Sequence, residues 1–367
     1  MERKRRKRRL SKQGKRYLFG FLGAMAIVGI VFGVVMGVRS CKVSASKRVL
    51  PFTADSKYFY TGDGFMFLSG KTLRYMNLVD EKKDFSIDVE SENVNLTGSE
   101  LIKALYGAST VRVIGTPFDN RIDGGIIKTA SGGKYVGVYV ETPDNTKALI
   151  VYNSTGAQTY RLDFSDSVLL DFGFEGGSSS VIYTTELSTL GGAITTTITT
   201  YDLSRESKTG VINISGQTVK NVILTKKSVF ALGTDSLVRF DRSTNEEAYR
   251  IICRGYDLKS SSRDGGKLHL MLKPSDNALM PVRVLTVSES NAPDDKMTEF
   301  VASTDAIDAF VMGGYVAIVH TDSINVYSTQ GKPVKSFSLD GADSAQKLDD
   351  KNILITRASE AILYTFK

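Results

Sequence analysis

From about residue 50 to the end of the chain, apolar and polar residues alternate in short runs, and no long segment repeats its apolar residues at helical spacing. These runs are rich in Val, Ile, Thr, Tyr and Phe, and they are separated by Gly, Asp, Asn and Ser, which favour turns. Residues 17–38 differ, because no charged residue interrupts this apolar run. The pattern predicts one apolar helix followed by a large all-β domain.

The β-rich part repeats one unit, which consists of a strand, a turn, a second strand that ends in an aromatic residue, a polar turn and a third strand. Clear copies begin at Gly133, Ser228 and Gly314. The second strands end at Tyr75, Tyr152, Tyr201, Phe240, Val287, Tyr327 and Tyr364. Most intervals between these positions lie near the roughly 40–50 residues of a four-stranded propeller blade. Residues 47–367 are therefore predicted to form a β-propeller of seven blades, with six or eight as alternatives.

The strand–turn–strand rhythm, as in residues 322–327 and 358–364, resembles that of the WD40-like and quinoprotein-like propeller superfamily. The chain contains no tryptophan, so it lacks both the Trp-Asp dipeptide and the tryptophan-docking repeat of these families. With its apolar N-terminal run, the chain also resembles exported single-pass propeller proteins of Gram-positive bacteria, whose function is mostly unassigned. That resemblance implies a membrane-anchored domain displayed outside the cytoplasm.

The last unit stops after its second strand, at about residues 352–366, and so lacks an outer strand. Residues 48–53 precede the first full unit and are expected to supply that strand. A ring closed in this way has no exposed sheet edge.

The interval between Tyr75 and Tyr152 is too long for one blade, and the excess is assigned to an insertion at about 91–124. Ser99 is predicted to cap a short helix there. The helix would place three apolar residues on one face, and with the tyrosine that follows they form a candidate recognition element: Leu101, Ile102, Leu105 and Tyr106. The alternatives are a plug over the central channel and an eighth, degenerate blade.

The charge of the chain is concentrated at its N-terminus. The chain has 47 Lys and Arg against 40 Asp and Glu, and ten of the basic residues lie in residues 1–16. Residues 17–38 are long enough to span roughly 30 Å of hydrocarbon as a helix. The positive-inside bias then predicts a cytoplasmic tail at 1–16, a linker at 39–46 and an extracytoplasmic domain at the plasma membrane. The basic tail is expected to contact anionic lipid headgroups, and nucleic acid is not an expected partner.

The apolar run has two alternative fates and one further feature. A secretory signal would be cleaved near Ala45, or the chain would be lipidated at Cys41 after cleavage; the run is longer than a typical signal sequence, which favours an uncleaved anchor. Gly29, Gly33 and Gly37 lie four residues apart on one face of the predicted helix. Small residues at this spacing let two membrane helices approach closely, so the segment is a candidate for self-association.

Residues that could carry chemistry are few. The two histidines, His269 and His320, fall in predicted strands at similar places in their units, and no set of three or four zinc ligands clusters in the sequence. The acidic turns lack the spacing of a calcium loop, and the glycine doublets precede strands and fit turns. Cys41 and Cys253 are not expected to pair, because Cys253 follows an apolar run and is predicted to be buried. No catalytic residue, metal ligand or cofactor is predicted.

These observations favour a membrane-tethered, non-enzymatic propeller that binds a protein or cell-envelope partner. The alternative is an extracytoplasmic enzyme, either a hydrolase or a quinoprotein-like oxidoreductase, that would use the channel of the propeller.

Overall fold

The computed structural model describes residues 43–117, 119–177, 179–189, 192–276, 278–288, 297–301 and 305–367. The predicted tail at 1–16 and membrane helix at 17–38 lie outside these ranges. Within them, no helix is both long enough and apolar enough to cross a membrane. The chain divides into two compact units, and the larger, Ser46–Thr365, contains the sheets.

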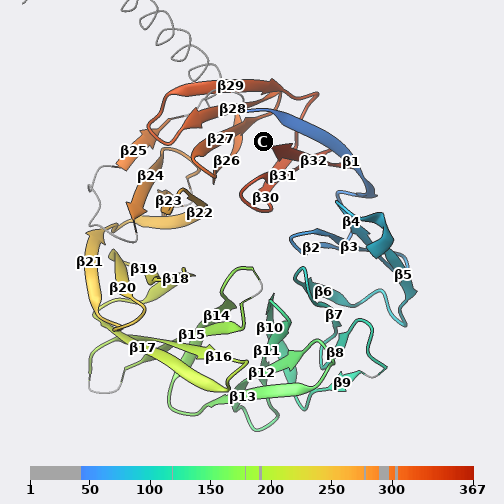
Figure 1. Cartoon of the computed structure of the whole chain (residues 1–367), viewed down its shortest axis with the longest axis vertical. Coiled ribbons are helices and arrows are strands. Elements are labelled where there is room, and N and C mark those ends of the chain that lie inside the picture. Colours follow the sequence, from blue (N-terminus) through green and yellow to red (C-terminus); the bar gives the residue numbers. More distant parts are fainter. Residues whose placement is uncertain are drawn as a thin grey trace, which may run out of the picture. The chain divides into compact units, whose positions relative to one another are not determined.

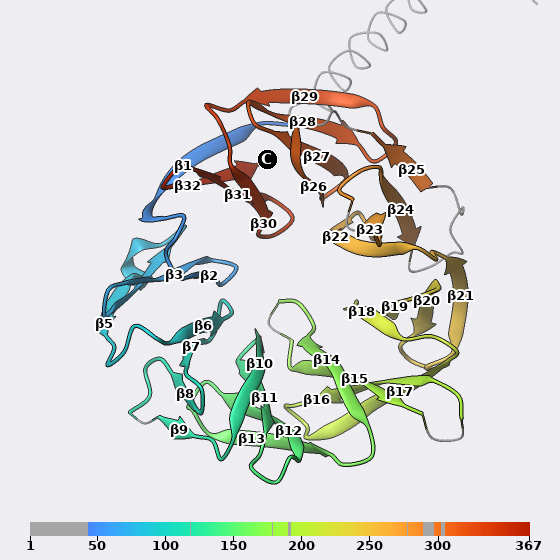
Figure 2. The ribbon, with the colours of Figure 1, turned by 180° about the vertical axis from the view of Figure 1, so that it is seen from behind.

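Eight four-stranded antiparallel sheets follow one another around this unit and form a closed ring (Figures 1 and 2). Blade 1 contains β2 (Tyr58–Tyr60), β3 (Gly64–Ser69), β4 (Thr72–Asn77) and β5 (Phe85–Asp88), with a 3-10 turn η1 (Glu81–Lys83) before its last strand. Blade 2 contains β6 (Asn95–Gly98), β7 (Lys103–Tyr106), β8 (Thr110–Val113) and β9 (Asn120–Arg121). Blade 3 contains β10 (Gly125–Gly132), β11 (Tyr135–Glu141), β12 (Lys147–Asn153) and β13 (Gln158–Phe164). Blade 4 contains β14 (Val168–Phe174), β15 (Val181–Ser188), β16 (Thr195–Asp202) and β17 (Ser207–Ser215).

The second half of the ring has the same plan. Blade 5 contains β18 (Val219–Leu224), β19 (Ser228–Gly233), β20 (Ser236–Asp241) and β21 (Glu247–Ile252). Blade 6 contains β22 (Tyr256–Asp264), β23 (Lys267–Pro274), β24 (Val282–Ser288) and β25 (Met297–Phe300). Blade 7 contains β26 (Ala306–Met312), β27 (Tyr315–His320), β28 (Ser323–Ser328) and β29 (Pro333–Ser338). Blade 8 contains β30 (Ser344–Lys347), β31 (Asn352–Arg357), β32 (Glu360–Phe366) and β1 (Ala45–Thr53).

The all-β propeller predicted from the sequence is confirmed, but the prediction of seven blades is wrong, because the ring has eight. The extra blade is blade 2, whose strands are four, four, four and two residues long. It occupies the segment that was assigned to an insertion. Val113 occupies in blade 2 the position that Tyr152 occupies in blade 3, because each pairs with the second residue of the preceding strand. Val113 also lies almost midway in the sequence between Tyr75 and Tyr152. The alternative of an eighth, degenerate blade in this segment is the correct one, and seven blades were preferred because a valine stands where most other blades have an aromatic residue.

The helix predicted to begin after Ser99 is wrong, because Lys103–Tyr106 is strand β7. This strand pairs with β6 on one side and with β8 on the other, so its backbone hydrogen bonds go to neighbouring strands. Ala104 and Leu105 are both buried, since blades pack on both faces of this sheet. The Ser99 hydroxyl caps no helix; it donates to the Gly133 carbonyl oxygen at 2.6 Å and accepts from the Leu101 amide at 3.3 Å.

The predicted closure of the ring is confirmed, because β1 is the outer strand of blade 8. Leu50 and Phe52 of β1 are 5% and 6% exposed, and they belong to a cluster that joins blade 8 to Phe65 of blade 1. Val49 and Pro51 flank Leu50 on the opposite face, and both are exposed, Val49 by 56%. This alternation is what a half-buried strand requires. Strand β1, the first strand of the described chain, therefore completes blade 8, the last blade of the ring.

Candidate functional site

The ring has two faces, which the topology distinguishes. Since successive strands are antiparallel, the turns between the second and third strands of each blade lie at the same end as the connections from one blade to the next. We call this end the crossover face. The turns between first and second strands and between third and outer strands lie at the other end, where β1 begins and β32 ends. We call this end the terminal face.

Charge differs between the two faces. Among the described residues of the crossover turns, carboxylates far outnumber basic groups, whereas the turns of the terminal face mix the two signs. The basic residues of the crossover turns are Lys57, Lys71 and Arg254. The carboxylates there are Asp55, Glu90, Glu92, Asp123, Asp144, Asp166, Asp235, Asp276, Asp305, Asp322, Asp340 and Asp343. Like charges concentrated on one face create a field that attracts partners of opposite charge.

Five inner strands share an irregularity that shapes the central opening. In β10, β14, β18, β22 and β26 the pairing with the second strand skips one residue near the start of the inner strand. Such a bulge bends the strand and re-aims the side chains beside it. The skipped residues are Ile127, Leu170, Lys220, Lys259 and Ile307.

Side chains at or next to these bulges form ion pairs between neighbouring blades. Lys259 of blade 6 pairs with Asp308 of blade 7, with Nζ 2.7 Å from Oδ1. Lys220 of blade 5 pairs with Asp257 of blade 6 at 2.5 Å, and Lys128 of blade 3 pairs with Asp171 of blade 4. These pairs link successive inner strands around the opening.

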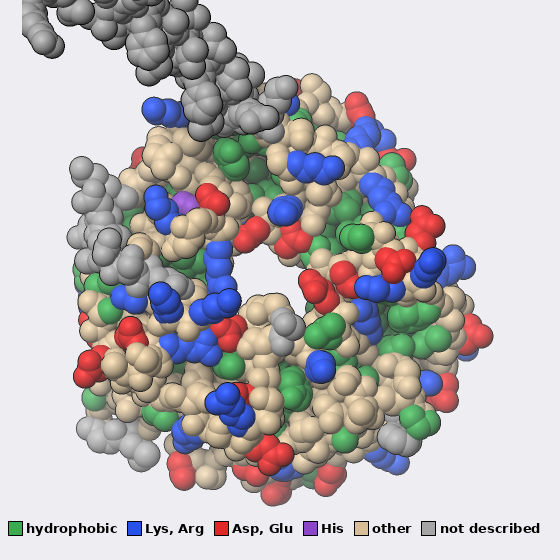
Figure 3. Space-filling model, viewed as in Figure 1, with side chains coloured by type: hydrophobic (Ala, Val, Ile, Leu, Met, Phe, Trp, Pro, Cys, Tyr) green, Lys and Arg blue, Asp and Glu red, His purple; other side chains and the backbone are tan. Residues whose placement is uncertain are grey.

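A second set of polar contacts lies at the turn between β30 and β31. Lys347 donates from Nζ to the Ser261 carbonyl oxygen at 2.5 Å and to Asp350 Oδ1 at 2.8 Å. The Arg263 amide donates to Asp350 Oδ2 at 3.2 Å, so blades 6 and 8 touch across the inner edge of blade 7. Burial lowers the pKa of Lys347, and the neighbouring Asp350 opposes this effect. Figure 3 shows Lys and Arg gathered beside the opening over β18 and β22, with Asp and Glu on the side of β30 and β2. Each lysine named above is paired with an aspartate. These pairs and the contacts of Lys347 and Asp350 with blade 6 link the blades around the opening.

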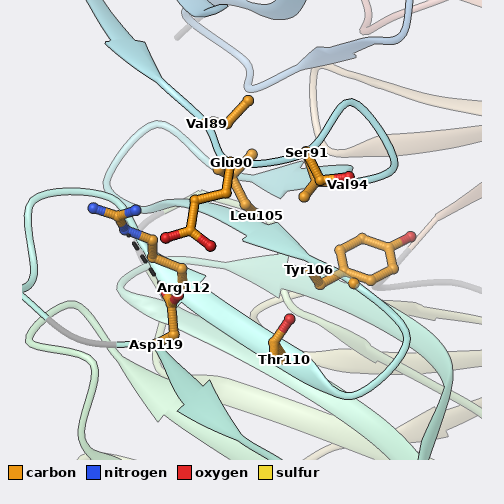
Figure 4. A pocket seen from close by; sticks show the side chains of 10 residues that line it. Val89, Glu90, Ser91, Val94, Leu105, Tyr106, Thr110, Arg112 and Asp119 are labelled. Carbon is orange, nitrogen blue, oxygen red and sulfur yellow. Dashed lines mark ion pairs between the residues drawn. The ribbon is translucent and has the colours of Figure 1, made fainter. Parts of the chain in front are cut away.

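A pocket lies between blade 2 and the connection that joins it to blade 1, and the outer strand of blade 2, β9, is only two residues long. It has a volume of about 190 Å³. Its lining combines Val89, Glu90, Ser91, Val94, Leu105, Tyr106, Gly107, Thr110, Arg112 and Asp119. Figure 4 shows Glu90 and Ser91 above the pocket, Tyr106 on one side and the Arg112–Asp119 pair on the other. In that pair Nε lies 3.6 Å from Oδ1.

Tyr106 also borders a second hollow of about 270 Å³ on the side of the inner strands. That hollow is lined by Ser56, Lys57, Tyr58, Asn95, Leu96 and Tyr106. Lys57 Nζ donates to the carbonyl oxygens of Glu92 and Val94, at 3.1 and 3.5 Å, and so fixes the connection between blades 1 and 2. The two hollows share Tyr106 and border the crossover turns of blades 1 and 2, and we call them together the Tyr106 groove.

The structure separates the predicted recognition residues. Leu105 and Tyr106 line the Tyr106 groove, Ile102 is 3% exposed in the core, and Leu101 is 47% exposed on a terminal-face turn. Gly29, Gly33 and Gly37 lie outside the described residues, as does Cys41. The sequence reasoning missed Glu90, Arg112 and Asp119. The only signal for them was the short spacing of strands around Val113, which marks a small blade.

The two histidines and Cys253 are buried in the part of the chain that the structure describes. His269 is 4% exposed, with Nδ1 2.9 Å from Thr286 Oγ1, and burial lowers its pKa. His320 is 7% exposed, with Nδ1 3.3 Å from Asp305 Oδ2. The two do not occupy similar places, because His269 is the third residue of its strand and His320 the last. Cys253 is buried in the core, as predicted. Among the described residues, no group of three or more His, Cys, Asp and Glu could hold a metal ion.

No model of a known protein family matches the chain, and no curated protein matches its sequence. Solved structures share its fold. The WD40 domain of SCAP from fission yeast superposes with a TM-score of 0.57 at 11% identity, over 88% of this chain and 98% of that one. The computationally designed Ika8 protein superposes with a TM-score of 0.54 at 12% identity, over 86% of this chain and 98% of that one.

These likenesses, at such low identity, concern the fold alone. Together with the closed ring of eight sheets, they define the class of the protein. It is an eight-bladed β-propeller with a WD40-like fold.

Proposed function

We propose that the chain is a membrane-tethered, extracytoplasmic propeller that acts as a binding or scaffold module for a protein or cell-envelope partner. The observation that carries the proposal is the asymmetry of the ring. Three of its inner lysines pair with aspartates of the next blade, while its crossover face presents an excess of carboxylates and borders an open groove. Propellers with a WD40-like fold are common scaffolds for protein interactions, which supports a binding role by analogy.

The sequence supports the tether. Residues 17–38 are long and apolar enough for a membrane helix, and the ten basic residues before them favour a cytoplasmic N-terminus. The linker joins the ring through β1, which begins at the terminal face. A tether attached there leaves the crossover face free for a partner. The basic tail would contact anionic headgroups, and Gly29, Gly33 and Gly37 would offer a surface for self-association of the helix.

Labelling of single cysteines on intact cells tests this display. The full chain carries Cys41→Ser, and one new cysteine replaces either the exposed Ser154 of the ring or Ser11 of the tail. A membrane-impermeant maleimide is expected to label the Ser154→Cys chain on intact cells and the Ser11→Cys chain only after lysis, because the membrane would separate the two positions. Native Cys253 is buried and serves as the unlabelled background. Labelling of the ring only after lysis would contradict the proposed display.

A further inference from the structure

The Tyr106 groove combines apolar walls with acidic surroundings. Val89, Val94, Leu105 and Tyr106 supply most of the apolar surface of its outer hollow. Leu105 is 4% exposed and Val89 is 6% exposed, so both belong to the packed wall, whereas Tyr106 is half-buried and lines both hollows. A half-buried aromatic side chain in such a wall offers apolar contact area to an inserted side chain.

The two basic groups at the groove differ. Arg112 pairs with Asp119, whereas Lys57 donates to the Glu92 and Val94 carbonyl oxygens and keeps its charge. Glu90 lines the outer hollow, and Glu92 lies two residues further along the same connection; both are exposed, and neither has an ion pair with any described residue. Together with Lys57, these two carboxylates leave one net negative charge beside the groove, which favours a basic partner.

We propose that the Tyr106 groove binds an extended polypeptide segment in which an apolar side chain lies beside Lys or Arg. The apolar side chain would enter the hollow against Leu105 and Tyr106, and the basic neighbour would meet Glu90 and Glu92. Charge complementarity selects this occupant, because carboxylates outnumber basic groups on the crossover face as a whole and would repel an acidic segment. The inference rests on the proposed binding function and names the site and the chemistry of the partner.

Peptides of defined chemistry test the proposal on the purified full chain in detergent, with detergent alone as the blank. Three fluorescent peptides of equal length alternate lysine with leucine, lysine with glycine, or glutamate with leucine. The lysine–leucine peptide is expected to bind, the lysine–glycine peptide about tenfold more weakly, and the glutamate–leucine peptide not measurably, as judged by fluorescence anisotropy. Equal binding of the two lysine peptides would mean that charge alone accounts for the binding. The proposal that an apolar side chain enters the Tyr106 groove would then be wrong.

Two variants locate the binding. Ser91→Trp fills the outer hollow from an exposed position without removing a packed side chain, and it is expected to weaken binding of the lysine–leucine peptide about tenfold. Combined Glu90→Gln and Glu92→Gln changes are expected to weaken binding and reduce its salt dependence. Leu101→Ala, on the terminal face, is the matched control and should bind as the unaltered chain does. Unchanged binding by Ser91→Trp would overturn the site.

The experiments distinguish failure of the proposed groove from failure of the proposed binding function. If a partner crosslinks to the ring on cells and Ser91→Trp does not affect that crosslink, the binding function stands and the Tyr106 groove is not its site. If neither a partner nor the lysine–leucine peptide binds, both proposals fail.

Discussion

Replacing Leu50 by Asp is expected to lower the free energy of unfolding by about 4 kcal/mol, one of the two largest effects we expect from single substitutions. Leu50 is 5% exposed, and its side chain belongs to the cluster through which β1 fastens blade 8 to blade 1. A carboxylate there would lose apolar burial and place an unpaired charge in the core. The loss should also loosen ring closure, because β1 is the outer strand of blade 8.

The neighbouring position gives a matched control. Val49→Asp changes the same strand by the same chemistry, but Val49 is 56% exposed, so this variant should stay within about 0.5 kcal/mol of the unaltered chain. Urea denaturation of both variants, followed by circular dichroism, measures the difference. Equal loss in the two variants would mean that β1 does not present Leu50 to the core, and the closure described here would be wrong.

Replacing Asp63 by Ala is expected to cost about 3 kcal/mol, because this carboxylate joins blades 1 and 2. Its oxygens accept hydrogen bonds from Thr61 Oγ1 at 2.8 Å, Tyr75 Oη at 2.7 Å and Asn77 Nδ2 at 3.0 Å. Lys103 Nζ of blade 2 lies 3.7 Å from Oδ1, and burial already lowers the pKa of Lys103. Without Asp63, the donors lose a shared acceptor and the half-buried lysine loses its counter-charge.

Two comparisons separate these contributions. Asp63→Asn keeps an acceptor for Tyr75 and Thr61 but removes the charge, so it should be less destabilising than Asp63→Ala. Asp55→Ala removes an exposed carboxylate from a crossover turn and should leave the denaturation midpoint nearly unchanged. A loss for Asp63→Ala no greater than that for Asp55→Ala would show that the carboxylate does not hold the two blades together.

The sequence predicted the fold well where the repeat was regular. Strands at 133–139, 149–152 and 228–232 were predicted from the repeated unit and are present, and the closure through residues 48–53 was predicted from the missing outer strand of the last unit. These strands are buried on both faces, so their sequences are nearly continuous apolar runs between turns, and such runs can be recognised without knowledge of neighbouring strands. Blade 2 was left as an alternative to an insertion, because its strands are short and Val113 replaces the aromatic residue that marked most of the others.

The candidate site was harder to predict, because it depends on which turns meet in space. Leu105 and Tyr106 were identified for an incorrect reason, as one face of a helix, although both line the groove as residues of a strand. The helical spacing of Leu101, Ile102 and Leu105 arose by chance from a turn followed by a strand buried on both faces. Glu90 and Asp119 come from turns far apart in sequence, so no local pattern could bring them together.

Crosslinking on intact cells tests the central claim, that the displayed ring is a binding module. The full-length chain is treated with a membrane-impermeant crosslinker, purified under denaturing conditions, and its adducts are identified by mass spectrometry. A reproducible adduct between ring residues and another protein or cell-envelope material is expected. The binding role would be contradicted if the reagent reached the ring but only the chain itself was recovered, alone or joined to its own copies.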